Sequence, residues 1–147
     1  MPDDVPPPAV QAFVQAVPHN RALGMRVVSL TRANAVFELP YDPKLVGNVD
    51  TGVLHGGAIT ALLDACSGAA VFAALVEMTS IATLDLRIDY LRPAEPGRDV
   101  VAHATCYRLA RNVAFTRALA YHDDEHDPIA SSAGTFMLGT RSGRERP

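Results

Sequence analysis

The sequence predicts one α+β domain in which a long helix is covered by an antiparallel sheet. Residues 56–76 carry a single charge, Asp64, in an otherwise apolar stretch, which predicts a long buried helix. After that stretch the pattern changes to a two-residue alternation, and further runs with strand character follow at short intervals. Because such a helix needs protein around it, an antiparallel sheet curled around the helix is the simplest cover.

Length and composition are those of an ordinary globular domain. The 147 residues include 48% apolar and 20% charged residues, and we expect a single domain over residues 1–147. The net charge of −3 and the lack of a long positive run disfavour a nucleic-acid binder. Cys66 and Cys106 lie far apart and form no CxxC motif, so neither a disulfide framework nor a thiolate metal site is indicated.

The two ends of the chain are polar or rich in proline. The segment MPDDVPPP is acidic and unlike a signal peptide, which predicts a cytoplasmic protein. We expect residues 1–8 and 140–147 to be frayed tails.

Several shorter elements are expected before the long helix. In order, the pattern predicts a helix over residues 9–17 that ends at 18–20, strands over 25–31 and 35–40 joined by a tight turn at 32–34, and a loop over 41–54. Prolines 6–8 are typical of a helix start, and the Gly, Asp, Asn and Pro residues of 41–54 are typical of a loop.

The second half of the chain predicts four strands. The first covers residues 80–91, followed by a turn-rich connection over 92–99 and by strands over 100–109, 112–121 and 128–138. In the first of these strands, the alternation places Ala82, Leu84, Leu86, Ile88 and Tyr90 on the buried face and Thr83, Asp85, Arg87 and Asp89 on the other.

A membrane-spanning role for residues 56–76 is disfavoured. Their length would suffice to cross about 30 Å of hydrocarbon. However, Asp64 lies at the centre, Ala and Gly are frequent, and Lys and Arg flank neither end. A carboxylate at mid-bilayer costs about 2.5–3.5 kcal/mol even on the lenient insertion scale. We therefore predict a core helix and no membrane association.

His55-Gly56-Gly57 stands at the entry of the long helix. The first N–H groups of a helix lack internal partners, and the helix dipole adds partial positive charge there. Two glycines let a ligand approach the backbone, so the site suits an anion or a developing oxyanion. Equally, Gly56 and Gly57 could serve only to let the helix start against another element, and the motif alone does not decide between the two.

The position of Asp64 favours a functional role for this carboxylate over a structural one. A buried, unpaired carboxylate is costly or becomes neutral, and carboxylates kept in such places are often bases or nucleophiles. The alternative is a structural Asp that accepts hydrogen bonds from Thr60 or Ser67, which lie on the same helix face.

The remaining reactive side chains have structural explanations. His122 and His126 stand four apart in YHDDEHD and would bind a metal only if that segment were helical. The segment lies between two strand patterns, so a solvated hairpin loop is expected. His103 lies within a strand, and Cys66 has no histidine partner placed by spacing.

Two segments together resemble a known family. GNVDTGVLHGGAITALLD followed by TLDLRIDYLRPAEPG resembles the hotdog-fold acyl-CoA thioesterases, most closely the PaaI-like branch of the 4-hydroxybenzoyl-CoA thioesterase superfamily. The resemblance covers roughly residues 24–138. It implies a hotdog fold, a homodimer or a homotetramer built as a dimer of dimers, and hydrolysis of an acyl-CoA without metal or cofactor.

The resemblance also implies roles for individual residues. Asp64 would be the catalytic base or nucleophile, the N–H of Gly57 would polarise the thioester carbonyl, and His55 would orient the thioester. Asn48 would help to hold the water or nucleophile. Thr83 would lie near the attacking water, which requires a bulge or a subunit seam to turn it toward the site. The implied substrate-binding residues are Val53, Leu54, Gly56, Ser67, Arg92 and Arg111.

The helix geometry predicts a site shared between subunits. Gly57 and Asp64 are seven residues apart, about 10 Å along the helix axis. A base and an oxyanion donor must both lie within about 3 Å of the reacting group. We therefore expect Asp64 of one chain to act with Gly57 of another across a two-fold axis.

Two other functions remain possible on the same fold, because fold does not fix function. One is a module that binds acyl-CoA or an acyl carrier without catalysis. The other is a hotdog dehydratase, although His55 followed directly by Gly-Gly argues against it. The small residues Ala61, Ala65, Gly68 and Ala69 leave room for an acyl group beside the helix, with Val53, Leu54 and Phe72 as its expected lining.

Overall fold

The structure is a computed structural model that describes residue 12 and residues 14–139. The tails expected over 1–8 and 140–147 lie outside the described residues. The elements are α2 (Pro18–Ala22), β1 (Arg26–Thr31), β2 (Asn34–Leu39), the 3₁₀ turn η1 (Pro43–Leu45), β3 (Val46–Asn48), β4 (Val53–Leu54), α3 (Gly56–Ala74), β5 (Ile81–Tyr90), β6 (Val100–Leu109), β7 (Val113–Tyr121) and β8 (Ala130–Leu138).

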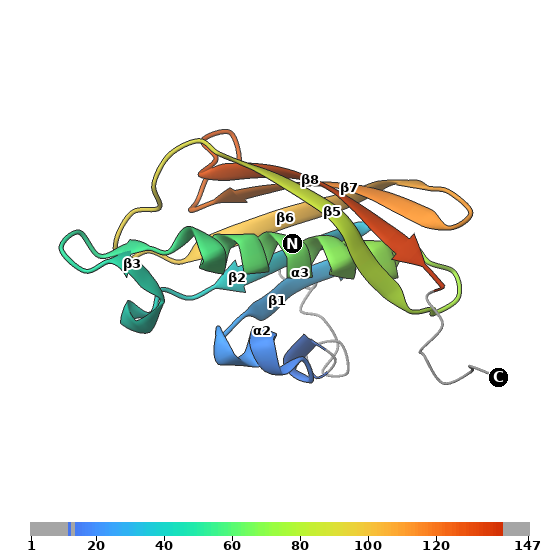
Figure 1. Cartoon of the computed structure of the whole chain (residues 1–147), viewed down its shortest axis with the longest axis horizontal. Helices are drawn as coiled ribbons and strands as arrows, with labels where there is room; N and C mark the ends of the chain where they lie inside the picture. Colours follow the sequence, from blue (N-terminus) through green and yellow to red (C-terminus); the bar gives the residue numbers. More distant parts are fainter. Residues whose placement is uncertain (1–11, 13, 140–147) are drawn as a thin grey trace.

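One antiparallel sheet curves around α3, as the sequence predicts (Figure 1). Its strand order is β1-β2-β6-β7-β8-β5, so β1 and β5 are its edges. The largest fully buried side chains include Phe37 and Phe136 of the sheet and Leu62 and Leu63 of α3. The core therefore lies between the helix and the concave face of the sheet.

The segment before β1 differs in part from the expectation. Within the helix expected over 9–17, residues 12, 14 and 15 are helical, and the others that are described form a turn and a bend. The expected end at 18–20 is wrong in detail, because Pro18 begins a second short helix, α2. The proline ring suits a first helical turn, since the missing N–H has no partner there in any case.

Residues 41–54 contain more structure than the loop that the composition predicts. The 3₁₀ turn η1 leads into a small hairpin in which β3 pairs with β4. Tight packing holds this hairpin against the helix entry, since a Cβ on Gly47 would lie 2.8 Å from the Cα of His55. Short polar segments of this kind carry little periodicity, so composition alone identified them only as a loop.

Strand β5 contains a bulge that changes which side chains face the helix. Its pairing with β8 shifts between Thr83 and Asp85, and Leu84 is 51% exposed. Thr83 lies opposite Phe136, and Leu86 opposite Gly134, on the inner face of β8. The predicted buried face therefore holds in part at Leu86 and Ile88, which are half-buried, and is wrong at Ala82, Leu84 and Tyr90, which are exposed. One inserted residue reverses the alternation, and it brings Thr83 inward as the resemblance required.

Helix α3 is buried on one side only, whereas its composition predicts burial all round. Nine of its 19 residues are buried, and its main contacts are with β2, β6 and β7. By length and hydropathy it could cross a membrane, but its packing against the sheet is that of a core helix. The other face, which bears Ala61, Ala65 and Ala69, is partly exposed within this chain.

Candidate active site

The open face of α3 forms the floor of a groove of about 810 Å³, here called the α3 groove. The helix contributes Gly57, Thr60, Ala61, Asp64, Ala65, Gly68, Ala69 and Phe72, the sheet Phe37, Ile81, Thr83, Leu86 and Phe136, and the segment before β1 Val14, Val17, His19 and Asn20. Most of these side chains are small or apolar, so the groove can hold an acyl chain next to one carboxylate. The room expected beside the small helix residues is present.

Asp64 and Thr83 meet in this groove. Thr83 Oγ1 donates a hydrogen bond of 2.9 Å to Asp64 Oδ1, across the space between β5 and α3. The bulge in β5 makes this contact possible, because an uninterrupted alternation would turn Thr83 outward. Asp64 is half-buried. The alternative of a structural Asp bonded to Thr60 or Ser67 is not what the structure has. Thr60 Oγ1 lies against the carbonyl of Gly56, and Ser67 Oγ has no hydrogen-bond partner among the described residues. A carboxylate oriented by a hydroxyl at the edge of an open groove can accept a proton or attack a carbonyl.

His55 caps α3 by accepting a hydrogen bond from the N–H of Gly57, the group that the resemblance assigns to the thioester oxygen. Its Nδ1 accepts a hydrogen bond of 2.8 Å from the N–H of Gly57. Both residues are exposed. A side chain on Gly57 would push the His55 ring aside, because a Cβ there would lie 2.9 Å from the same nitrogen. The Gly57 N–H is thus a hydrogen-bond donor at an exposed helix entry. A ligand oxygen could accept its hydrogen bond in place of the imidazole or together with it.

Asn48 does not meet Asp64 within this chain. It ends β3, is exposed, and uses its side chain locally. Its Oδ1 accepts from the N–H of Asp50 at 3.0 Å and of Thr51 at 3.3 Å, which shapes the turn toward β4. Asn48 thus shapes the turn between β3 and β4 and is not among the residues that line the α3 groove.

Four of the six predicted substrate-binding residues border a different, smaller pocket of about 470 Å³. They are Val53, Leu54, Gly56 and Arg92. Val53 and Leu54 were expected to line the space beside the helix, but they are not among the residues that line the α3 groove. Arg92 is held by Asp127, with Nη2 at 2.9 Å from its carbonyl oxygen and 3.1 Å from its carboxylate, and the Arg92 Nε is buried without a partner among the described residues.

The other two predicted substrate-binding residues are not brought to the groove. Ser67 is fully buried in α3 and is not among the residues that line the groove in this chain. Arg111 lies in the exposed turn between β6 and β7. A helix that is apolar all round gives no signal of which face is open, so the sequence could not place Ser67 on one side or the other.

The structure adds groove residues that the sequence does not indicate. His19 of α2 borders both the α3 groove and a small pocket that Lys44, His55 and Gly57 also line. Val14 and Val17 also line the groove. A short segment before the first strand carries no motif, so only its packing could reveal this role.

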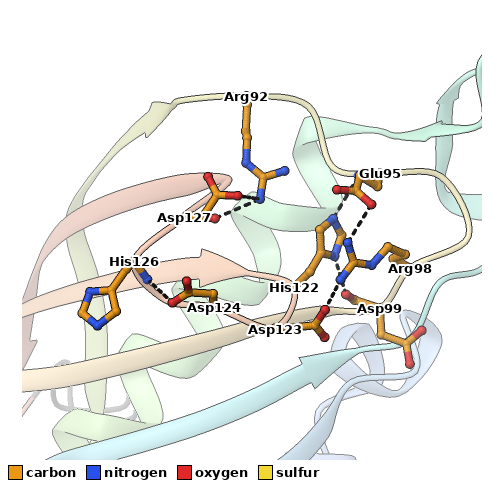
Figure 2. A network of polar contacts seen from close by, with 9 residues as sticks. All are labelled: Arg92, Glu95, Arg98, Asp99, His122, Asp123, Asp124, His126 and Asp127. Carbon is orange, nitrogen blue, oxygen red and sulfur yellow. Dashed lines mark hydrogen bonds and ion pairs between the residues drawn. The ribbon is translucent and has the colours of Figure 1, made fainter.

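The histidines of the hairpin between β7 and β8 do not form a metal site. Figure 2 shows His122 and His126 apart from one another within a network of polar contacts, in which His126 is linked only through its backbone N–H to Asp124. His122 is 6% exposed, and its Nε2 accepts from the N–H of Glu95 at 2.9 Å while Nδ1 lies 2.7 Å from Asp99 O. Both ring nitrogens of His122 are therefore engaged by backbone groups, which leaves neither for a metal ion. No group of three or more metal-ligating side chains is found among the described residues.

Ion pairs of Arg98 hold the same connection in place. Arg98 bonds Glu95 at 2.6 Å and also pairs with Asp123, and the hydrogen bond from Arg98 lowers the pKa of Glu95. The expectation of a solvated loop at residues 121–127 holds for His126, which is exposed, but is wrong for His122. His122 ties the hairpin to the 92–99 connection through Glu95 and Asp99.

His103 and Cys66 are structural, as expected. His103 is half-buried in β6 and contacts Glu125 at 3.2 Å. Cys66 is fully buried, and burial raises the pKa of its thiol to about 12. A thiol of this kind is protonated at neutral pH and is a poor nucleophile.

Comparison with known proteins agrees with this geometry. The family model of the thioesterase superfamily matches residues 51–129. The chain is 32% identical over 142 residues to "Medium/long-chain acyl-CoA thioesterase YigI" of Escherichia coli, covering 88% of this chain and 90% of the relative. A crystal structure from Pseudomonas aeruginosa superposes with a TM-score of 0.78 at 44% identity, covering 86% of this chain and 94% of that one.

A second solved structure identifies the branch. A structure of the phenylacetic acid degradation protein PaaI from Thermus thermophilus superposes with a TM-score of 0.71 at 28% identity, covering 82% of this chain and 97% of that one. The overall fold is thus shared with these solved structures. The chain belongs to the thioesterase superfamily, as a thioester-hydrolysing enzyme of the PaaI-like hotdog type.

Proposed function

We propose that this protein hydrolyses acyl-CoA to a carboxylic acid and free coenzyme A, with Asp64 as the base or nucleophile. The observation that carries the proposal is the hydrogen bond between Thr83 and Asp64 inside an apolar groove. The reaction needs water or a carboxylate next to the thioester carbon. Asp64 and Thr83 line the groove that would hold the acyl chain. The proposed reaction uses no cofactor and takes place in the cytoplasm.

The polar groups have distinct roles in the proposed reaction. Asp64 either removes a proton from water or attacks the carbonyl carbon itself, and Thr83 holds the carboxylate in position. The N–H of Gly57 binds the thioester oxygen as it gains negative charge, replacing or sharing the bond to His55. A donor of this kind is worth about 10²–10³ in rate.

The proposed site is formed by two copies of the chain. Gly57 and Asp64 are about 10 Å apart along α3, too far for one helix to place both on one carbonyl. Two features favour a second copy as the cover of the groove: α3 is apolar on its open side, and the ten-residue strand β5 beside it is an unpaired sheet edge. Asp64 and Thr83 then come from one subunit, and His55, Gly57 and Asn48 from the other, in a dimer or a dimer of dimers.

The acyl group that best fits the groove is of medium or greater length. A volume of about 810 Å³ lies in the upper part of the range of small-molecule sites. The name of the relative YigI includes medium- and long-chain acyl-CoA. We therefore expect kcat/KM to be higher for decanoyl-CoA than for acetyl-CoA, measured as thiol release with a colorimetric thiol reagent.

The same assay separates the other functions. Saturable binding of acyl-CoA without thiol release would indicate a binding module and contradict hydrolysis. Loss of water from a 3-hydroxyacyl-CoA, again without free thiol, would indicate a dehydratase. A preference for acetyl-CoA over decanoyl-CoA would contradict the assignment of the groove while leaving hydrolysis in place.

Arg111→Ala is expected to raise KM for acyl-CoA with less effect on kcat. We propose that the exposed Arg111 meets a phosphate of coenzyme A, and such a remote contact stabilises substrate and transition state alike. The increase in KM should shrink as salt rises, because salt screens exposed charges. Arg32→Ala, at the exposed turn between β1 and β2, is the control with the same loss of charge. Equal KM values for wild type and Arg111→Ala at low salt would remove Arg111 from the site.

A further inference from the structure

The peptide group between Gly56 and Gly57 accepts hydrogen bonds that the proposed reaction leaves unexplained. Tyr90 Oη donates to the carbonyl oxygen of Gly56 at 2.7 Å, and Thr60 Oγ1 lies 3.1 Å from the same oxygen. The carbonyl of Gly56 and the N–H of Gly57 belong to one planar, conjugated unit. Tyr90 and Thr60 therefore act on one end of the group whose other end is the proposed donor to the thioester.

Counting hydrogens shows how the two hydroxyls are connected. A third contact, of 2.5 Å, joins Thr60 Oγ1 to Tyr90 Oη. Each hydroxyl has one hydrogen, so two hydrogens serve three contacts. The arrangement that uses the two shortest contacts has Thr60 donating to Tyr90 and Tyr90 donating to Gly56. Hydrogen bonds in such a chain polarise one another, which makes Tyr90 a stronger donor to the carbonyl.

The fold brings these groups together from two elements. Tyr90 is the last residue of β5 and lies on the inward face with Leu86 and Ile88, while Thr60 is on the first turns of α3. The ring packs directly over Gly56, since a Cβ there would lie 3.4 Å from the Cζ and Oη atoms of Tyr90, an ordinary van der Waals contact.

We propose that Tyr90, supported by Thr60, is a positioning residue for thioester hydrolysis that acts through the Gly56–Gly57 peptide. The inference rests on the proposed function, because the Gly57 N–H matters only if it holds the thioester oxygen. By drawing electron density toward the Gly56 oxygen and fixing the plane of the peptide, Tyr90 makes the Gly57 N–H a stronger and better aimed donor. Such a donor acts most strongly in the transition state, where the thioester oxygen is negative.

Tyr90→Phe is expected to lower kcat by about threefold to tenfold, the size of one neutral hydrogen bond, with little change in KM. The substitution keeps the ring and removes only the hydroxyl. Thr60→Val should lower kcat in the same direction, and Thr60→Ser, which retains the hydroxyl, should restore the rate relative to Thr60→Val. If these hydroxyls had a purely structural role, the substitutions would change the stability of the protein and leave both kcat and KM unchanged.

The amide resonance of Gly57 gives a readout that needs no turnover. In ¹H–¹⁵N spectra of the free protein, this N–H is bonded to His55 Nδ1, and a weaker donor gives an upfield proton shift. We expect that shift in Tyr90→Phe. The matched control is Tyr41→Phe, which removes a 2.8 Å hydrogen bond from a tyrosine hydroxyl to the carbonyl of Gly52 and should leave the Gly57 resonance in place.

The outcomes separate this proposal from the proposed function. An unmoved Gly57 resonance in folded Tyr90→Phe overturns the polarisation, whatever the activity. A moved resonance with unchanged kcat overturns the positioning role. If the resonance moves but the wild type releases no thiol from any acyl-CoA, the effect on the peptide is supported and the thioesterase function fails. Thr60→Val supplies the same test if Tyr90→Phe does not fold.

Discussion

Asp64→Asn is expected to lower kcat for acyl-CoA hydrolysis by about 10²–10⁴ while the protein stays folded and still binds coenzyme A. This is the usual contribution of a positioned acid or base, and a larger loss is expected if Asp64 attacks the thioester itself. The amide keeps the volume of the side chain and can still accept the hydrogen bond from Thr83. What it loses is the ability to take a proton or to act as a nucleophile.

The measurement is kcat from thiol release, together with a thermal unfolding curve for each variant. Asp85→Asn is the matched control, because Asp85 is an exposed carboxylate on the same strand as Thr83 and loses the same charge. If Asp64→Asn retains kcat within about threefold of wild type, Asp64 is structural and the proposed mechanism is wrong.

Two inactive variants are expected to restore activity when they are refolded together. The variants are Asp64→Ala and Gly57→Val; the valine displaces the His55 ring, since even a Cβ at Gly57 would lie 2.9 Å from its Nδ1. If chains pair at random, half of the dimers are mixed and each mixed dimer has one intact site. Activity should then return to about a quarter of the wild-type value, because the proposed site takes Asp64 from one subunit and Gly57 from the other.

A same-side pair provides the control for this experiment. Asp64 and Thr83 are hydrogen-bonded within one chain, so Asp64→Ala mixed with Thr83→Val should show no activity above the average of the two variants alone. Gly57→Ala can replace Gly57→Val if the bulkier variant does not fold. Persistent inactivity of the first pair, with mixed dimers shown to be present by differently tagged chains, would exclude the shared site.

Much of the fold could be predicted from the sequence because the relevant patterns are local. The apolar run that becomes α3 and the alternation in β6, β7 and β8 define these elements within about one residue of their bounds at most ends. The turn at residues 32–34 was also predicted, and Ala33 adopts a φ of 63° there. In each case the residues that determine the element lie within the element or next to it.

The candidate site was predicted in its residue types and only in part in its geometry. His55, Gly57 and Asp64 were identified because the chemistry of a helix entry and of a carboxylate in an apolar stretch can be read locally. The sequence also required a bulge or a seam to bring Thr83 inward, and the structure supplies the bulge. It could not indicate that Ser67 is fully buried, because a helix with apolar residues on every side does not reveal its covered face.

The sequence by itself determined that a long core helix begins at His55-Gly56-Gly57, carries Asp64, and is followed by antiparallel strands. Only the tertiary structure decided which hydroxyl meets which carboxylate or carbonyl: Thr83 with Asp64, and Tyr90 with Gly56. The physical reason is distance along the chain. These pairs are 19 and 34 residues apart, and their contacts depend on strand register, a single inserted residue in β5 and the side from which the sheet covers the helix. None of these is encoded within the few residues over which hydrophobic periodicity and capping act.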